Sequence, residues 1–413
     1  MRDTSVTGNG NKIMRLLFLA STLPRFPGDS QANFVREQAD AWLAARPEHH
    51  ITILAPHDTG ALREERHGRL TIVRFRYMRP EGWQRLAYPA ILPNLQRNPL
   101  LALQVPLFLL AQAQAAQRII REDGVDAIYA HWVMPQGLVA YWLKRTTGTP
   151  YILQTHSSDL PIFAKAGAAG RRVALALLRG CRRFFCVNSS QLDIAESYHP
   201  PGERAEFASK VSVLPMGVAD LGVARPESDG PDIGVMGRFS RKKGFDFLIE
   251  AAEQLARDGV RPRIVIAGDG EEAARLKALV HVANVEFPGF LVGAEKEAFL
   301  ASCARFAFPS KATEGDVEGL PVALLEALMR GQPVLASRDT NVELLPEWPR
   351  ISDDVVLVSD PSDLVVLADA LRGLLQKPPG AATESAKILS RYRWERLIEE
   401  YLLPIEQSLT EPG

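Results

Sequence analysis

The sequence predicts an α/β protein made of two doubly wound, Rossmann-like domains. At 413 residues the chain is too long for one ordinary core. Short apolar runs alternate with amphipathic helical patterns in both halves, which is typical of parallel sheets flanked by helices. A stretch rich in Pro, Gly and Asp, residues 213–232, separates the halves. We therefore expect an N-terminal domain over 13–215 and a C-terminal domain over 216–392.

The N-terminal domain follows a polar stretch, residues 1–12, that we expect to be a frayed leader. Between the first two strands, residues 33–46 place apolar side chains at helical spacing with charges opposite, which predicts a helix. Seven runs are predicted as strands: MRLLFLAS (14–21), HITILAP (50–56), LTIVRFR (70–76), AIYAHW (127–132), YILQTH (151–156), RFFCVNS (183–189) and VSVLP (211–215).

Three residues follow or end predicted strands, where open α/β sheets bind ligands. Gly28 comes after the first strand, and either lets the backbone approach a ligand closely or makes a plain tight turn. His131 and His156 each end a strand. A lone histidine is more often a structural hydrogen-bonding residue, but two at successive strand ends favour a site, with His131 as an acceptor-side candidate.

The segment 74–110 combines arginines with aromatic residues and leads into the most apolar run of the chain, 100–116. One interpretation is an amphipathic surface that touches anionic lipid headgroups and admits a lipid-linked acceptor. The other is a loop and a buried helix of the first domain. Pro106 and several glutamines argue against a membrane-spanning helix, which needs roughly 20 mostly apolar residues.

The C-terminal domain opens with DIGVMGRFSRKKG (232–244), a strand that leads into a glycine and a cationic loop. Arg238 offers a planar fork to phosphate and Lys243 a point charge, so together they can balance a diphosphate. Arg241 and Lys242 are expected to be solvated. A long helix is predicted over 244–259, and at the end of the chain an amphipathic helix over 388–409.

The stretch 312–337 carries the strongest motif. An acidic turn runs into Pro321, which suits the first position of a helix, and Gly331 suits its end. The turn at Gly319, Leu320 and Pro321 therefore brings a helix start beside free backbone N–H groups, which favours phosphate. Glu318 and Glu326 flank that site. A carboxylate does not bind phosphate, so we expect the pair to serve hydroxyls or cations beside it, and a sugar-phosphate-ribose ligand would use both.

These motifs resemble the family 4 glycosyltransferases, retaining enzymes with the GT-B fold. The E-x7-E motif of the family reads Glu318-GLPVALL-Glu326, and THSSD (155–159) resembles its T-H-G-x-D element. The resemblance implies two domains that face each other across a cleft, with the donor mainly on the second, and a terminal helix, about 393–413, that packs back on the first. Its implied site residues are the catalytic Arg238, Lys243, Glu318 and His156, and the donor-binding Glu326, Gly319, Leu320, Pro321, Gly28, Gly237, Gly268 and Phe290.

Two departures from the family pattern stand out. Ser157 replaces the usual glycine after His156, and RDTNVELL (338–345) replaces an expected Gly-Gly loop. Gly268 belongs to a Gly-Asp-Gly turn, and the backbone near Phe290 would meet the nucleobase.

The function expected from the resemblance is metal-independent transfer of a hexose from a nucleotide-diphosphate sugar to a hydroxyl of a glycan or lipid-linked acceptor, in cell-surface polysaccharide or glycolipid assembly. No cofactor beyond the nucleotide sugar is expected. The alternatives are a nucleotide-sugar epimerase or hydrolase of the same fold and a catalytically silent nucleotide-sugar-binding protein.

Composition and charge define the expected partners and compartment. Lys+Arg 48 against Asp+Glu 49 gives a net charge of −1, so nucleic acid is not expected as a partner. Three cysteines form neither a disulfide framework nor a zinc-ligand set. These features favour a cytoplasmic protein, with peripheral contact at the inner face of the cytoplasmic membrane as the more specific hypothesis.

Overall fold

The computed structural model describes residues 13–29, 31, 33–156, 159–219, 222, 230–313 and 318–410. The expected leader (1–12), Ser157 and the acidic positions 314–316 of the predicted turn lie outside the described residues. The chain divides into two compact units. Unit 1 comprises Met1–Leu214 and Glu395–Gly413, and unit 2 comprises Pro215–Trp394.

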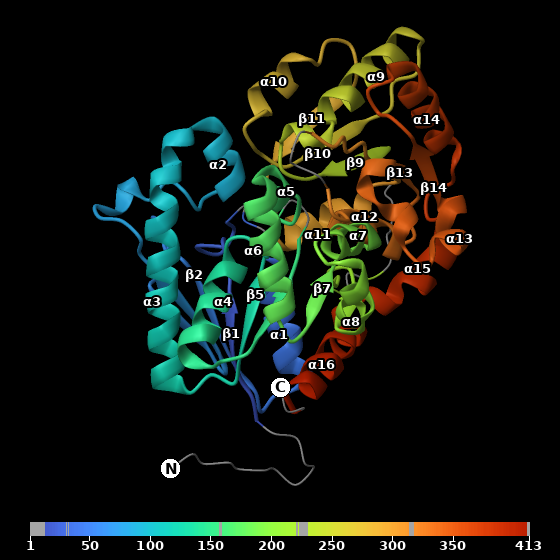
Figure 1. Ribbon diagram of the computed structural model, residues 1–413. Coiled ribbons are helices and arrows are strands. Elements are labelled where there is room, and N and C mark those ends of the chain that lie inside the picture. Colours follow the sequence, from blue (N-terminus) through green and yellow to red (C-terminus); the bar gives the residue numbers. More distant parts are fainter. Residues whose placement is uncertain are drawn as a thin grey trace. The chain divides into compact units, whose positions relative to one another are not determined.

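Unit 1 is built on an eight-stranded sheet with the order β3-β4-β2-β1-β5-β6-β7-β8. All pairs are parallel except β3 with β4 at one edge. Figure 1 shows β2, β1, β5 and β7 side by side, with α4 and α6 in front of them. Their bounds are β1 Arg15–Leu19, β2 His50–Pro56, β3 Glu64–His67, β4 Leu70–Phe75, β5 Ala127–His131, β6 Tyr151–Gln154, β7 Phe184–Cys186 and β8 Val211–Val213.

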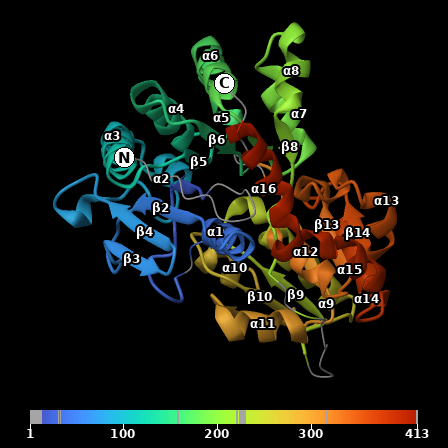
Figure 2. The same ribbon diagram turned by 90° about the horizontal axis from the view of Figure 1, so that it is seen from below.

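Helices cover both faces of this sheet, as Figures 1 and 2 show, with α3, α4 and α6 on one face and α1 and α16 on the other. Arg46, just after α1, bonds to Glu399 at 2.8 Å and to Glu406 at 2.9 Å, which ties α16 to α1. The helices are α1 Phe34–Ala45, α2 Ile91–Arg97, α3 Val105–Asp123, α4 Gln136–Thr147, α5 Pro161–Lys165, α6 Gly167–Gly180, α7 Ser189–Ser197, α8 Arg204–Ser209 and α16 Trp394–Thr410.

The seven strands predicted for this half all form, and the predicted helix 33–46 becomes α1. Strand β3 was not predicted. Its sequence, Glu-Glu-Arg-His, lacks any apolar residue because it lies at the edge of the sheet, with three of its four residues exposed. The prediction of one continuous helix over 388–409 was wrong, because helix α15 ends at Leu389 and a short turn separates it from α16.

The apolar run 100–116 lies within one helical segment, Pro99–Asp123, formed by a 3-10 turn (η2, Pro99–Gln104) and α3. By length and composition, with a mean hydropathy of 1.4, this segment could cross a membrane. In unit 1, however, α3 is a layer of the fold. Phe108, Gln112 and Ala116 are fully buried, and the Gln112 amide donates to the Ala20 carbonyl at 3.2 Å.

Unit 2 contains a six-stranded parallel sheet with the order β11-β10-β9-β12-β13-β14. Its four inner strands, β10, β9, β12 and β13, are almost wholly apolar and buried, as expected when helices cover both faces. The bounds are β9 Ile233–Met236, β10 Ile264–Ala267, β11 Val285–Gly289, β12 Phe306–Phe308, β13 Val334–Ser337 and β14 Val355–Val358.

The helices of unit 2 include α9, predicted over 244–259, which places Leu248, Ile249 and Leu255 in the core with Leu367 and Leu371 of α14. Helix α12 begins at Val322, with Pro321 as its N-cap rather than its first residue, so the predicted start was wrong by one position. The helices are α9 Phe245–Arg257, α10 Ala273–Ala278, α11 Gly293–Ser302, α12 Val322–Met329, α13 Trp348–Ile351, α14 Leu364–Gln376 and α15 Thr383–Leu389.

Candidate functional site

In unit 2 the order of the strands reverses between β9 and β12. Strands β10 and β11 extend the sheet on one side of β9, and β12, β13 and β14 extend it on the other. Open α/β sheets bind ligands outside the carboxyl ends of the strands at such a switch point. Arg238 and Lys243 follow β9 directly, and the segment that leads to Glu318 follows β12. The predicted cationic loop therefore lies at the position where this fold binds ligands.

Two glycines allow the loops at this edge of the sheet to approach each other closely. A Cβ on Gly268 would lie 2.0 Å from the Gly237 carbonyl oxygen, and a Cβ on Gly244 would lie 1.9 Å from the Pro309 carbonyl oxygen. Gly244 has φ +64°, a left-handed conformation that favours glycine. The Phe239 N–H donates to the Asp269 carbonyl at 2.8 Å. The turn that carries Arg238 is thus fixed against the Gly-Asp-Gly turn that follows β10.

Lys243 and Glu318 form an ion pair, although 75 positions separate them in sequence. Lys243 Nζ lies 2.8 Å from Glu318 Oε2, and the two side chains are 18% and 13% exposed. Burial raises the pKa of Glu318. The positive charges of Lys243 and then Lys242 lower it by more than burial raises it, so the pKa of Glu318 lies below its ordinary value. The structure therefore brings the cationic loop and the turn before α12 into contact, with an ionised carboxylate between them.

Arg238 is paired on the neighbouring turn. Its guanidinium donates through Nε and Nη2 to Glu271 Oε2, at 3.1 and 3.0 Å. The Arg238 side chain is 33% exposed and the Glu271 side chain 23%, so solvent reaches both. Sequence reasoning missed Glu271, which directly follows the Gly-Asp-Gly turn. Both predicted phosphate-binding cations are therefore held by carboxylates in this structure.

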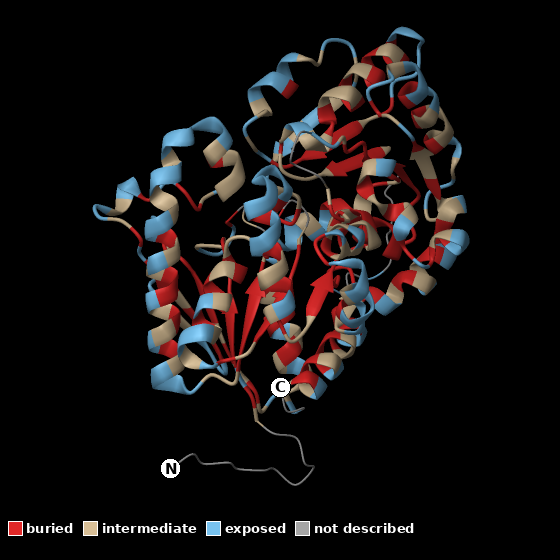
Figure 3. Ribbon diagram, viewed as in Figure 1, coloured by how far each residue is buried: buried red, intermediate tan, exposed pale blue. Residues whose placement is uncertain are grey.

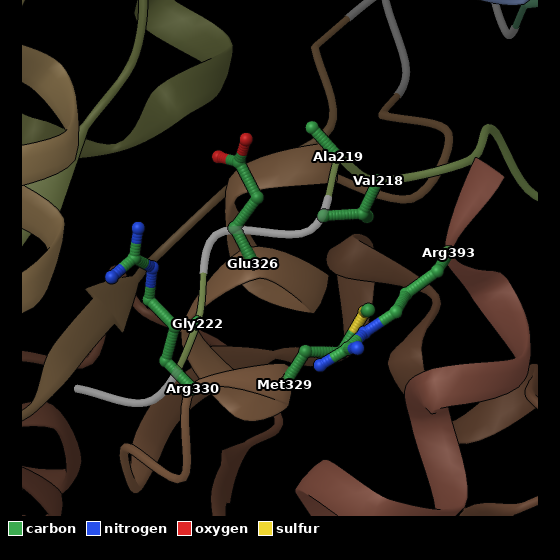
Figure 4. A pocket seen from close by; sticks show the side chains of 7 residues that line it. All are labelled: Val218, Ala219, Gly222, Glu326, Met329, Arg330 and Arg393. Carbon is green, nitrogen blue, oxygen red and sulfur yellow. The ribbon is translucent and has the colours of Figure 1, made fainter. Parts of the chain in front are cut away.

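Glu326 lies inside α12 and is 5% exposed, paired with Lys296 of α11 at 2.7 Å. Sequence reasoning missed Lys296, which carries no motif of its own. Glu326 also borders a small pocket, where Figure 4 shows it one helical turn from Arg330, with Arg393 pointing toward Met329. The remaining lining residues are Val218, Ala219 and Gly222. Arg238 and Lys243 do not line this pocket, so it lies apart from the cationic loop.

The turn before α12 is held by Asn341, which sequence reasoning also missed. Its side-chain amide donates to the carbonyls of Glu318 and Gly319, at 3.0 and 2.7 Å. Asn341 has φ +60° and stands in the segment that replaces an expected glycine-rich loop. Asparagine tolerates this left-handed conformation better than most residues. The signal that could have identified Asn341 in the sequence is therefore an asparagine in a segment where a glycine-rich loop was expected.

The predicted nucleobase contact, Phe290, follows β11 at the same edge of the sheet and is 41% exposed. The Gly268 N–H donates to the Gly289 carbonyl at 2.8 Å, which joins the residue before Phe290 to the Gly-Asp-Gly turn. Gly237, Gly268, Leu320 and Phe290 are thus gathered with the cationic loop at one end of the unit 2 sheet.

The predicted residues of unit 1 also lie at the carboxyl ends of strands. The strand order reverses between β1 and β5, and Gly28 follows β1 with φ +84°. His131 ends β5, and His156 follows β6. His131 Nδ1 lies 3.2 Å from His156 Nε2, and the rings are nearly parallel, 5.4 Å apart. His131 is fully buried, whereas part of His156 is exposed.

Asp159 holds the two histidine loops together. One carboxylate oxygen accepts the Thr155 hydroxyl at 2.7 Å and the His156 N–H at 3.1 Å, and the other accepts the Val133 N–H at 2.7 Å. Asp159 is 7% exposed. It is the aspartate of the THSSD element, so the motif contained the signal for this positioning residue even though our site prediction left it out.

We expect the histidine pair to make folding sensitive to acid. Burial lowers the pKa of His156 to about 3, and burial and then His156 lower the pKa of His131 well below 6.5. Below about pH 6.5 the unfolded chain takes up protons that the folded chain does not, so stability falls as pH falls. By about pH 5 each imidazole costs up to about 2 kcal/mol.

Denaturant unfolding at about pH 7.5 and about pH 5 would measure this loss. His156→Asn should lose less stability on acidification than the wild type does, because one of the two imidazoles is gone. An equal loss in both proteins would contradict the assignment.

Comparisons with known proteins match most of the chain. A family model described as "Glycosyltransferase Family 4" matches residues 31–219, and one described as "Glycosyl transferases group 1" matches residues 230–377.

A solved structure from Anabaena, HepE in complex with UDP-glucose, matches with a TM-score of 0.63 at 17% identity and covers 94% of this chain and 99% of that one. At this identity the match concerns the fold.

Two curated relatives show how far the sequence similarity extends. WcaL of Salmonella typhimurium, which is named for colanic acid biosynthesis, is 38% identical over 115 residues. The match covers 27% of this chain and 28% of that relative's length. A GDP-mannose-dependent mannosyltransferase of Corynebacterium glutamicum, named for a monoacylated phosphatidylinositol monomannoside, is 28% identical over 72% of this chain and 80% of its own length.

Proposed function

This chain belongs to family 4 of the glycosyltransferases, and from that premise we propose that it transfers a hexose from a nucleotide-diphosphate sugar to a hydroxyl of a glycan or lipid-linked acceptor, with retention of anomeric configuration. The family and the GT-B fold expected from the sequence are thereby confirmed. The observation that carries the proposal is the contact between Lys243 and Glu318 at the switch point of the unit 2 sheet.

The donor diphosphate, in this proposal, binds at Arg238 and Lys243 and takes the place that Glu271 and Glu318 occupy around those cations. The Arg238–Glu271 pair, which solvent reaches, contributes only about 0–1 kcal/mol, and a diphosphate carries more negative charge than either carboxylate that it would replace. The N–H groups at the start of α12 add a second source of positive potential. Because these charges are fixed before the reaction, they stabilise the diphosphate as it gains charge on leaving.

Glu318, once released from Lys243, is free to accept hydrogen bonds from sugar hydroxyls beside the diphosphate. Before the donor binds, Lys243 and Lys242 hold the pKa of Glu318 below its ordinary value, so the donor meets an ionised carboxylate. Glu326 is held by Lys296 and, in this proposal, accepts a ribose hydroxyl. Neither carboxylate is assigned as a nucleophile. The departing phosphate oxygen takes the proton of the acceptor hydroxyl as its bond to the sugar breaks. Arg238 and Lys243 balance the charge of the leaving diphosphate, so the proposal assigns this role to no metal.

His156 is proposed to take part in catalysis as a neutral imidazole rather than as a cation, because its pKa of about 3 keeps it uncharged at neutral pH. His131 has no exposed surface, so we assign it the role of orienting His156 through their shared hydrogen bond. We place the acceptor function on unit 1 and the donor function on unit 2. A cytoplasmic location accords with three free, buried cysteines, Cys181, Cys186 and Cys303.

The acceptor class is proposed from the relatives. One is named for the assembly of a polysaccharide and one for a mannoside of phosphatidylinositol. We therefore propose a role in cell-surface polysaccharide or glycolipid assembly.

The proposed function is tested by screening nucleoside-diphosphate sugars for thermal stabilisation of the full chain, then incubating the best donor with polysaccharide and lipid-linked acceptors. Mass spectrometry should detect one added hexose, and NMR of the product should show the anomeric configuration of the donor. A chelator should leave the rate unchanged. Turnover of donor without acceptor would instead indicate an epimerase or hydrolase, and donor binding without turnover a silent binding protein.

A further inference from the structure

We propose that unit 1 docks on an anionic lipid surface through an exposed ridge of leucines at the start of its longest helix. This docking goes beyond the proposed function, because it requires neither donor nor transfer. The leucine ridge consists of Leu100, Leu103, Leu107 and Leu110. They are 74%, 77%, 44% and 53% exposed.

The spacing of the leucine ridge places all four side chains on one stripe of the helical segment Pro99–Asp123. Steps of three, four and three residues return to the same face of a helix. The opposite stripe packs on the sheet through Phe108, Gln112 and Ala116, all fully buried. Figure 3 shows the N-terminal part of this helix, near α2, largely in the exposed colour, with buried bands further along. The segment thus has one apolar face for the core and a second that the core leaves uncovered.

Trp83 and two arginines extend this surface. Trp83 is 59% exposed, and its carbonyl accepts from the Gln104 side chain at 2.9 Å. The Arg85 N–H donates to the same side chain at 3.2 Å, and the Asn94 amide donates to the Arg85 carbonyl at 3.2 Å. These bonds hold the loop at Trp83 and Arg85 beside the leucine ridge. Arg97, at the end of α2, is also exposed.

The charge of this region identifies the partner. From Gly82 to Gln117 the sequence contains no Asp or Glu but carries Arg85 and Arg97. Exposed apolar side chains flanked by arginine, with an aromatic at the rim, match a bilayer surface of anionic headgroups above acyl chains. A second copy of this chain would bring arginines against arginines, so self-association through the same face is disfavoured.

The same helix does not suit a membrane-spanning role, although its length and composition would allow one. Crossing a bilayer would remove Phe108, Gln112 and Ala116 from the core of unit 1 and break the bond from Gln112 to the Ala20 carbonyl. Beyond Leu110 the exposed positions become polar, with Gln114, Arg118 and Arg121. The apolar surface is therefore confined to one end of the helix, as expected for contact with an interface.

Flotation of the full chain with vesicles tests the proposal. We expect binding to vesicles that contain phosphatidylglycerol, weaker binding to vesicles of phosphatidylcholine alone, and loss of the difference at high salt. Leu100→Gln with Leu103→Gln should reduce binding about tenfold or more. Arg85→Gln with Arg97→Gln should reduce binding to the anionic vesicles by about fivefold for each arginine.

Matched controls are Leu403→Gln, at a 51% exposed leucine on α16, and Arg121→Gln at the far end of α3; both should bind as the wild type does. Thermal unfolding shows whether each variant keeps the wild-type fold. Absence of binding by the folded wild-type chain, or equal binding by the ridge variants, would overturn the proposal. So would a wild-type dimer that the ridge variants abolish, because it would assign the surface to a second copy of the chain.

Discussion

Lys243→Ala should lower turnover by about a hundredfold to a thousandfold, the usual effect of removing one preorganised group that stabilises transition-state charge. The lysine is one of two cations proposed to balance the leaving diphosphate, and its Nζ already lies against an anionic group, Glu318 Oε2, at 2.8 Å. Removing the lysine also leaves the mostly buried Glu318 carboxylate without this partner, which should cost about 1–3 kcal/mol of stability, so turnover is measured at a temperature at which both proteins are folded.

The matched control is Arg241→Ala, in the same basic loop. The Arg241 side chain is 79% exposed and points to Glu272 at 3.6 Å rather than to the turn before α12. This variant should keep turnover near the wild-type value. Steady-state kinetics with the identified donor, with thermal unfolding in parallel, would compare the two variants. Turnover of Lys243→Ala within about threefold of the wild type would remove the lysine from the mechanism.

The strands were predictable because the two sheets bury their central strands on both faces. HITILAP was predicted over 50–56, and β2 spans His50–Pro56. Such a strand has a nearly continuous apolar sequence. By contrast, β3 pairs only at the sheet edge and shows no apolar signal, so the same reasoning missed it. Helix α12 was predictable for a different reason, because Pro321 and Gly331 mark its two ends.

The candidate site was predictable only in part, because motifs single out candidate ligand-binding residues but not the partners that hold them. The sequence indicated Arg238, Lys243, Glu318 and Glu326. It did not indicate that Arg238 pairs with a glutamate 33 positions away. Nor did it indicate that Glu326 pairs with a lysine 30 positions away. These contacts depend on which strands lie next to each other, and a pairwise spacing in the sequence does not contain that information.

The glycine of the Gly-Asp-Gly turn is the second position at which we expect a large effect. Gly268→Ala should destabilise unit 2 by about 2–4 kcal/mol, combining backbone strain with overpacking. Gly268 has φ +148°, and its Cβ would lie 2.0 Å from the Gly237 carbonyl oxygen and 2.9 Å from the Phe239 ring. Hydrogen bonds of 3.1 and 2.8 Å, from Gly237 to Ala267 and from Phe239 to Asp269, oppose any separation of the two turns.

The consequence for function is that Arg238, which lies between Gly237 and Phe239, must move with the displaced turn. Affinity for nucleoside diphosphates such as UDP, GDP and ADP should therefore fall by about tenfold or more, since 1.4 kcal/mol corresponds to a factor of ten. The control is Gly259→Ala, in the turn after α9, which shares a positive φ of +87° but has no atom within 4 Å of its Cβ. It should show the backbone strain, about 1–2 kcal/mol, without the displacement. Calorimetric unfolding and titration with each nucleotide separate the two effects, and equal losses in both variants would show that the close approach of the turns does not position Arg238.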